Sequence, residues 1–218
     1  MKTEDLLRLI RVGVSLSVAA LLGGVAAGCE NSHAKLGEGH DFGVNNPGVV
    51  AAMGDSITEG IPDVPSYPPI LAGMSGKTVI NFGAGGMKSG YGADTIDGVL
   101  ASSHPGFVII LFGANDAIHG VPVDYTINNI RYMIRAALAN KTIPVVCTVM
   151  PIVGMYYMYN GGVEAINAVL PGMAEQEGAA VVDLYSLFQG HPEFYFYNGL
   201  HPNELGAQAI ARSIADLF

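Results

Sequence analysis

A serine that directly follows a short apolar run is the first residue whose surroundings suggest chemistry. Ser56 ends the sequence Gly-Asp-Ser at residues 54–56, after the apolar residues 49–53. A serine on a tight turn from a strand into a helix presents its hydroxyl beyond the edge of a sheet, where it could act as a nucleophile. Asp and Ser also favour turns and helix N-termini, so the motif alone is compatible with a structural turn.

Two further segments follow apolar runs and could supply hydrogen-bond donors. Gly85 and Gly86 come after residues 78–82, and glycine lets the backbone approach a ligand closely because it has no β-carbon. The N–H group of either glycine could bind an oxyanion. Asn115 follows residues 107–112 and adds a side-chain amide. Each segment alone could be an ordinary turn, and the glycines do not have the spacing of a phosphate-binding loop.

His201 is the best candidate for a general base among the six histidines. It lies in the segment Asn198–Asn203, directly before a stretch with helical spacing, so a loop could carry it to a serine at the end of the first strand. Two of the other histidines fall near the N-terminus, and three lie in connecting segments where we expect them to be solvated. The sequence therefore predicts a Ser56–His201 pair.

These residues need a scaffold that brings distant segments together, and the alternation of elements predicts one. Stretches typical of helices span Val123–Asn140, Val163–Glu177 and Glu204–Phe218. Short apolar runs typical of buried strands span Val49–Met53, Thr78–Phe82, Phe107–Phe112, Ile143–Met150 and Ala179–Leu184. The pattern predicts an α/β fold with a parallel five-stranded sheet covered by helices on both faces. In such folds the site lies at the carboxyl ends of the strands.

In this order, the four segments resemble the SGNH/GDSL hydrolase family, and the likeness covers the chain from about Val49 to its end. The resemblance implies a flavodoxin-like, three-layer α/β/α fold and hydrolysis of carboxylic esters or thioesters through an acyl-enzyme. It assigns the nucleophile to Ser56, the base to His201, and the oxyanion hole to Ser56, Gly86 and Asn115. No metal and no organic cofactor is expected.

One position departs from the pattern of that family. The family usually has Asp three residues before the histidine, where this sequence has Asn198. An amide can accept a hydrogen bond from the ring, but it has no charge to stabilise imidazolium, and in a serine protease the Asp-to-Asn change lowers kcat by about 10⁴. Three interpretations remain. Ser56 and His201 work as a dyad oriented by Asn198 or a backbone carbonyl, Glu193 supplies the acid, or most activity is lost. The last is compatible with a lipoprotein that only binds carbohydrate or acyl ligands.

The composition excludes several other classes of protein. Half of the residues are hydrophobic and 13% are charged, which suits a single globular domain. The formal net charge of −9, without a cluster of Lys and Arg, argues against a nucleic-acid partner. Cys29 and Cys147 have the spacing of neither a disulfide framework nor a zinc site.

Residues 65–71 and 155–159 could line a pocket for a small-molecule or glycan ester, or they could pack in the core. The sequence does not predict the oligomeric state.

The N-terminus has the layout of an export signal. Three basic residues within positions 2–11 precede an uncharged apolar stretch that ends in small residues before Cys29. This ending resembles the lipobox of bacterial lipoproteins, in which the cysteine is lipidated; ordinary secretion or an uncleaved anchor are the alternatives. We expect a signal peptide at 1–28, a lipidated Cys29 with a tether at 29–47, and the hydrolase domain at 48–218.

The expected location is the bacterial cell envelope, with the membrane reached through the lipid on Cys29. In lipoproteins an Asp after the cysteine is the usual signal for retention in the inner membrane, and this sequence has Glu30 there. That residue favours the outer membrane of a Gram-negative host, with the domain facing the periplasm.

Overall fold

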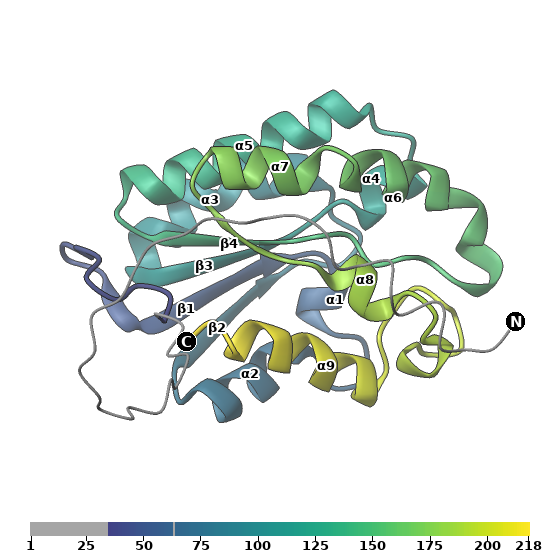
Figure 1. Ribbon diagram of the computed structural model, residues 1–218, viewed down its shortest axis with the longest axis horizontal. Coiled ribbons are helices and arrows are strands. Elements are labelled where there is room, and N and C mark those ends of the chain that lie inside the picture. Colours follow the sequence, from purple (N-terminus) through teal and green to yellow (C-terminus); the bar gives the residue numbers. More distant parts are fainter. Residues whose placement is uncertain (1–34, 63) are drawn as a thin grey trace, which may run out of the picture. The chain divides into compact units, whose positions relative to one another are not determined.

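A computed structural model describes residues 35–62 and 64–218, which are built around one parallel sheet (Figure 1). Its strand order is β2-β1-β3-β4-β5, and every neighbouring pair is parallel. The strands are β1 (Asn46–Gly54), β2 (Thr78–Gly83), β3 (Pro105–Leu111), β4 (Ile143–Cys147) and β5 (Ala180–Val182). This is the flavodoxin-like order, so the predicted α/β fold with five parallel strands is confirmed.

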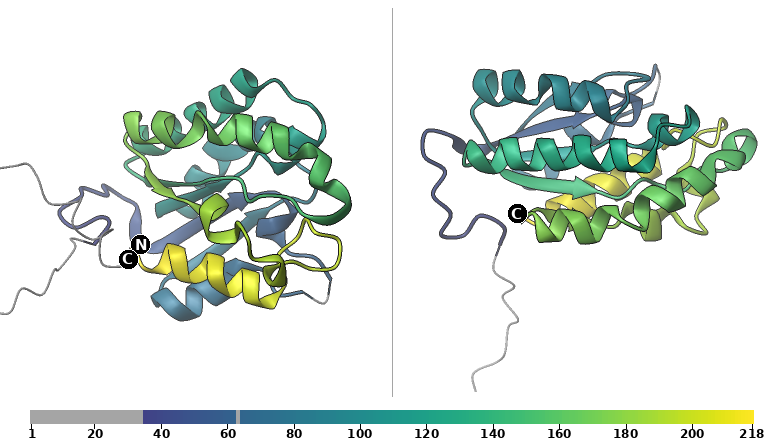
Figure 2. Two further views of the ribbon diagram at one scale, coloured as in Figure 1. Left: turned by 45° about the vertical axis from the view of Figure 1, so that its right-hand side comes forward. Right: turned by 90° about the horizontal axis from the view of Figure 1, so that it is seen from above.

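Helices cover both faces of the sheet (Figures 1 and 2). One layer contains α3 (Ser89–Ser103), α4 (Ala114–Ile118), α5 (Val123–Ala139), α6 (Asn160–Asn167) and α7 (Leu170–Gln176). The other contains α2 (Tyr67–Ser75) and α9 (Glu204–Ala215), which pack against each other. Short helices occupy the loops: α1 (Ser56–Glu59), α8 (Leu184–Phe188) and the 3₁₀ helices η1 (Gly154–Tyr159) and η2 (Pro192–Phe194).

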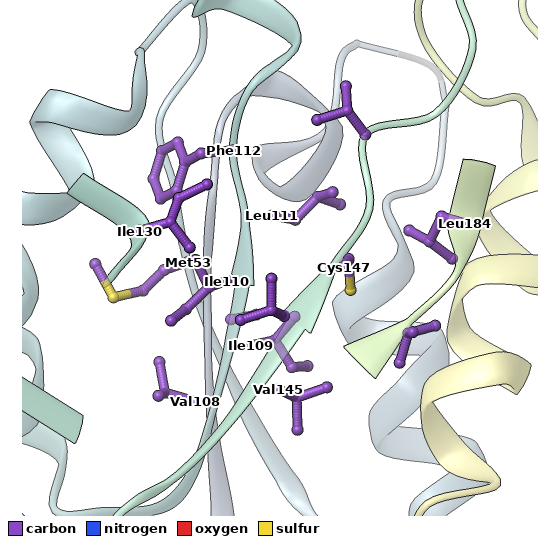
Figure 3. Packing of buried hydrophobic residues seen from close by; sticks show 14 of the residues in the cluster. Met53, Val108, Ile109, Ile110, Leu111, Phe112, Ile130, Val145, Cys147 and Leu184 are labelled. Carbon is purple, nitrogen blue, oxygen red and sulfur yellow. The ribbon is translucent and has the colours of Figure 1, made fainter. Parts of the chain in front are cut away.

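The core lies on both sides of the central strands (Figure 3). Successive side chains of a strand point to opposite faces, so Ile110 of β3 lies toward Ile130 of α5, whereas Ile109 lies on the other face beside Val145. All four are at most 1% exposed. Burial of each such side chain contributes roughly 1.5–3 kcal/mol. Because helices cover both faces, the strands are apolar at nearly every position rather than at alternate ones.

Some elements differ from the sequence pattern for local reasons. The helix predicted over Val163–Glu177 is divided into α6 and α7, because Pro171 has no N–H to continue the hydrogen-bond ladder. The pattern does not predict α3, whose three glycines lower its intrinsic helix propensity; its buried face, which includes Ile96, stabilises it instead. The strand predicted to reach Leu184 ends at Val182, since the following residue caps α8.

The segment expected to be a tether is partly built into the domain. The N–H of Leu36 donates to the carbonyl of Leu217 at 2.8 Å, and Phe42 packs edge-on against Phe107 of β3. β1 then begins at Asn46, before the expected domain boundary. The packed part of the chain therefore starts at about residue 36, because apolar side chains scattered among polar residues in this segment find partners on the sheet.

The predicted signal peptide at 1–28, Cys29 and the tether up to residue 34 lie outside the described residues. In the stretches 35–62 and 64–218, no helix is long and apolar enough to cross a membrane.

Candidate active site

The strand order brings three of the predicted segments to one edge of the sheet. β1 lies between β2 and β3, so the residues that follow these strands are neighbours at the carboxyl edge. Ser56 begins α1 after β1, Gly86 follows β2, and Asn115 lies in the first turn of α4 after β3. The fourth segment, with His201, arrives from the C-terminal part of the chain before α9.

A close approach between backbone segments fixes the position of Ser56. A β-carbon on Gly54 would lie 2.1 Å from Thr58 Oγ1 and 2.6 Å from the Leu111 carbonyl oxygen, so only glycine allows α1 to fold back at this point. Asp55 caps α1, because its Oδ1 accepts the N–H of Ile57 at 2.9 Å. Asp55 therefore has a structural role as a helix cap, and it presents Ser56 at the start of the helix.

Ser56 and His201 are in hydrogen-bond contact. Ser56 Oγ lies 2.9 Å from His201 Nε2, although the residues are 145 positions apart in the sequence. The histidine loop is closed by a hydrogen bond of 2.8 Å from the Phe196 N–H to the His201 carbonyl, and Asn203 caps the following α9. Partial burial lowers the pKa of His201 below its usual value, so the imidazole is mainly neutral at neutral pH.

Asn198 faces the second ring nitrogen with its amide nitrogen. Asn198 Oδ1 accepts the backbone N–H groups of Leu200 and His201, each at 3.1 Å, and Nδ2 lies 2.7 Å from His201 Nδ1. The opposite amide orientation would set NH₂ against two N–H donors. Gly199 makes this turn possible: its φ is +71°, and a β-carbon would lie 2.2 Å from the Val153 carbonyl oxygen.

The orientation of Asn198 determines where neutral His201 carries its proton. Because Nδ2 is a donor, Nδ1 must be the acceptor, and the ring proton is on Nε2, directed at Ser56. This is the tautomer that cannot take the serine proton. The interpretation in which Glu193 supplies the acid is wrong, since Glu193 Oε1 lies 2.8 Å from His191 Nδ1 instead. The group that orients His201 is therefore Asn198.

The predicted oxyanion donors differ in whether their hydrogens already have an acceptor. Across residues 35–62 and 64–218, no group accepts the N–H of Ser56 or of Gly86. The glycine loop lies close to the serine, since a β-carbon on Gly85 would be 3.8 Å from Ser56 Cβ. The Asn115 amide instead donates to Asp55 Oδ2 at 3.0 Å and to the Met87 carbonyl at 3.2 Å. Asn115 would have to release the Met87 carbonyl to bind an oxyanion.

Two buried carboxyl groups, those of Asp55 and Asp116, support this arrangement. Asp55 is 1% exposed, and burial raises its pKa to about 7 despite hydrogen bonds from Ile57 and Asn115. Asp116 is fully buried and accepts the N–H and hydroxyl of Ser89, at 2.9 and 2.5 Å. It thereby fixes the start of α3 and the loop before it. The signal in the sequence was the position of each Asp in the segment that follows a buried strand.

The pKa of Asp55 predicts a pH dependence of stability. Folded Asp55 keeps a proton up to about pH 7, whereas in the unfolded chain it is lost near the ordinary value of 3.8. Because the folded state then binds more protons, the free energy of unfolding should fall between about pH 4 and pH 7, by up to about 4 kcal/mol. Urea denaturation across this range should show the slope in the wild type and a smaller slope in Asp55→Asn. Equal slopes would contradict the assignment.

A small apolar pocket adjoins the serine. Its accessible volume is only about 10 Å³, and it is lined by Ile61, Val64, Pro65, Ser66 and Pro202 together with the two catalytic candidates. Of the segments expected to line a pocket, residues 65–71 contribute only their first residues. Tyr67 of that segment is fully buried in the core. Residues 155–159 form η1, whose Tyr157 lines a different groove near α8.

Other nucleophiles and ligands in the described part of the chain have no comparable setting. Cys147 is buried in the core (Figure 3), and burial raises the pKa of its thiol to about 12, so it is not a thiolate at neutral pH. Among residues 35–62 and 64–218, no group of three or more His, Cys, Asp or Glu side chains is placed to hold a metal ion.

Known proteins share both the sequence pattern and the fold. The profile of the GDSL-like Lipase/Acylhydrolase family matches residues 52–209. An arylesterase from Vibrio mimicus is 28% identical over 176 residues, which cover 75% of this chain and 84% of that protein.

Two solved structures superpose on most of the chain. A lipase/acylhydrolase from Enterococcus faecalis has a TM-score of 0.68 at 23% identity, covering 77% of this chain and 93% of its own. A member of the lipolytic protein G-D-S-L family from Veillonella parvula has a TM-score of 0.68 at 22% identity, covering 78% and 97%. At these identities the likeness establishes the fold.

Proposed function

Because this chain belongs to the GDSL-like lipase/acylhydrolase family and is a carboxylic ester hydrolase, we propose that Ser56 is its nucleophile and His201 its general base. The observation that carries this proposal is the 2.9 Å contact between Ser56 Oγ and His201 Nε2. The contact lies at the carboxyl edge of the sheet, where doubly wound folds place their ligands. It also adjoins a small, mainly apolar pocket.

The reaction has two steps. His201 Nε2 takes the proton of Ser56, Oγ bonds to the carbonyl carbon of the ester, and the alcohol leaves with that proton. Water, activated by the same imidazole, then releases the acid from the acyl-serine. The N–H groups of Ser56 and Gly86 stabilise the negative oxygen of each tetrahedral intermediate. The Asn115 amide joins them when the substrate oxygen replaces the Met87 carbonyl as its acceptor.

Asn198 makes the first proton transfer costly. Nε2 can act as a base only when the ring proton sits on Nδ1, where it points at the hydrogens of Asn198 Nδ2 at 2.7 Å. Two donors then oppose each other without an acceptor between them, so the reactive tautomer is scarce. The wild-type protein is therefore a slow esterase, with its oxyanion donors supplying much of its rate. If the reactive tautomer never forms, the same site binds ligands without turning them over.

The pocket favours small acyl groups. Its accessible volume of about 10 Å³ is far below the 300–1,000 Å³ typical of sites for drug-sized ligands, so it has no room for a long acyl chain. Apart from Ser56, Ser66 and His201, the described residues of the pocket wall are apolar, which suits an acetyl or another short acyl chain. The substrate class is thus a short-chain or acetyl ester, including a thioester, of a small molecule or glycan.

Nitrophenyl acetate tests the role of Ser56. The wild-type protein should release nitrophenol faster than buffer, and Ser56→Ala should fall to the background rate, because no other hydroxyl contacts His201 Nε2 among the described residues. Ser102→Ala is a matched control, since that exposed serine on α3 bonds only within its own helix. Equal rates for Ser56→Ala and the wild type would refute the nucleophile assignment.

We also propose that the chain is exported to the bacterial cell envelope and anchored there through a lipid on Cys29. The support is the sequence alone: basic residues, an apolar stretch and small residues before the cysteine. Labelled palmitate should enter the wild-type protein in cells and not Cys29→Ala. Labelling that persists in the variant would rule out this anchor.

A further inference from the structure

We propose that Asn198 is a site of spontaneous deamidation, which converts it into the aspartate that His201 lacks; this inference rests on the proposed roles of Ser56 and His201. Asn198 is followed by Gly199. A glycine in this place has no β-carbon to obstruct its nitrogen from reaching the preceding side-chain amide. The pair lies near the tip of the loop that the Phe196–His201 hydrogen bond closes. Water can reach the half-buried Asn198, whereas Gly199 is buried and its N–H meets solvent when the loop opens locally.

The surroundings of the amide favour its loss. The N–H groups of Leu200 and His201 both point at Asn198 Oδ1, at 3.1 Å. When a nucleophile attacks Cγ, negative charge develops on Oδ1, and these two donors stabilise it as an oxyanion hole does in acyl transfer. The leaving nitrogen, Nδ2, lies 2.7 Å from His201 Nδ1, which can supply a proton in the imidazolium form. The contacts that orient the amide therefore also activate it.

The conversion consumes one water and releases one ammonia. The Gly199 nitrogen loses its proton to the solvent and bonds to Asn198 Cγ, the Cγ–Nδ2 bond breaks, and Nδ2 leaves as ammonia with a proton from His201. His201 regains that proton from the solvent. Water then attacks Cγ of the cyclic imide and breaks its bond to the Gly199 nitrogen, which restores the N–H and leaves a carboxyl group. No atom changes its oxidation state.

Another asparagine of the same chain that precedes a glycine serves as a comparison for Asn198. Asn160 also precedes a glycine, but it is 8% exposed and stands at the start of α6. Its Oδ1 accepts the Ile152 N–H at 2.8 Å, and its Nδ2 donates to the Ile152 carbonyl at 2.7 Å. No acid faces its amide nitrogen, and the helix holds its backbone. At Asn198 the backbone is held by two hydrogen bonds of a loop, from the Gly199 N–H to Phe196 at 2.9 Å and from the Val153 N–H to the Gly199 carbonyl at 2.8 Å, and loops open locally more easily than helices.

Peptide mass mapping of the full chain during incubation between mildly acidic and neutral pH, where part of His201 is imidazolium, tests the modification directly. We expect the mass change of NH₂ to OH to accumulate at residue 198 and not at residue 160. Ser56→Ala should convert at the wild-type rate, because the reaction does not use the serine. Asn198→Gln should not convert, since its longer side chain would close a less favourable ring. An unchanged residue 198, or equal conversion at both Asn-Gly pairs, would overturn the proposal.

Activity on nitrophenyl acetate, followed in the same samples, tests the consequence. Wild-type turnover should rise in proportion to the Asp formed and approach the rate of Asn198→Asp, while Asn198→Gln stays constant. Conversion without a gain, or conversion to isoaspartate alone, would overturn the activating role. Failure of the proposed function is distinguishable, because Asn198→Asp would then be inactive while the mass change at residue 198 still appeared.

Discussion

Replacing Asn198 by aspartate is expected to raise kcat for nitrophenyl acetate by about 10²–10⁴, the scale on which the reverse change impairs a serine protease. A carboxylate oxygen at the position of Nδ2 would accept the Nδ1 proton of His201, 2.7 Å away, and leave Nε2 free to take the proton of Ser56. The other carboxylate oxygen keeps the two backbone N–H groups that Oδ1 now accepts, so the loop needs no rearrangement.

The pH profile separates this effect from a general change in stability or charge. The pKa of His201 is lowered by burial in the wild type, and a neighbouring carboxylate would raise it. The acid limb of kcat/KM should therefore move to higher pH in Asn198→Asp, while KM changes little. Asn128→Asp adds the same charge on the exposed face of α5 and should alter neither rate nor profile. A rate in Asn198→Asp no higher than in the wild type would contradict the assignment.

Removing the serine hydroxyl from the Asn198→Asp protein is expected to have the largest effect of all. The Ser56→Ala, Asn198→Asp double variant should lose about 10⁵–10⁶ in kcat relative to Asn198→Asp, as in other serine hydrolases that lose their nucleophile. The gain from Asn198→Asp exists only if His201 passes a proton to or from Ser56. In the Ser56→Ala background, Asn198→Asp should therefore change nothing.

The four rates form a double-mutant cycle, which measures the coupling between positions 56 and 198 although Asn198 contacts only the histidine loop. Unfolding midpoints of the four proteins should remain similar, because the substitutions remove neither core volume nor a buried apolar contact. Independent, additive effects of the two substitutions would show that Asn198 does not act through the serine.

The fold and the main pair of the site were accessible from the sequence because their signals are local. Each strand is a short apolar run, and parallel strands carry their following loops to one edge, so Ser56 and Asn115 were expected at the same edge. The structure adds that their strands, β1 and β3, are neighbours. The place of His201 directly before a helical stretch, and the resemblance of the four segments to a known family, then identified it as the partner of Ser56. α3 and the packed segment after Leu36 were not accessible, because tertiary contacts stabilise them against their own weak propensities.

The electrostatics of the site depend on contacts that no local pattern encodes. Asn198 was visible as a departure, but the direction of its amide follows from two backbone N–H groups that point at Oδ1. Likewise, the engagement of Asn115 by Asp55 and Met87 depends on how three loops meet. These contacts determine which nitrogen of His201 carries the proton and which donors are free to bind an oxyanion. Both affect the rate of catalysis.

The position of the proton on His201 is the most direct test of the account. Nitrogen-15 NMR of the imidazole, recorded above its pKa, distinguishes the two neutral tautomers. We predict the proton on Nε2 in the wild-type protein and on Nδ1 in Asn198→Asp. A wild-type ring with its proton on Nδ1 would contradict the claim that the Asn198 amide withholds the base from Ser56.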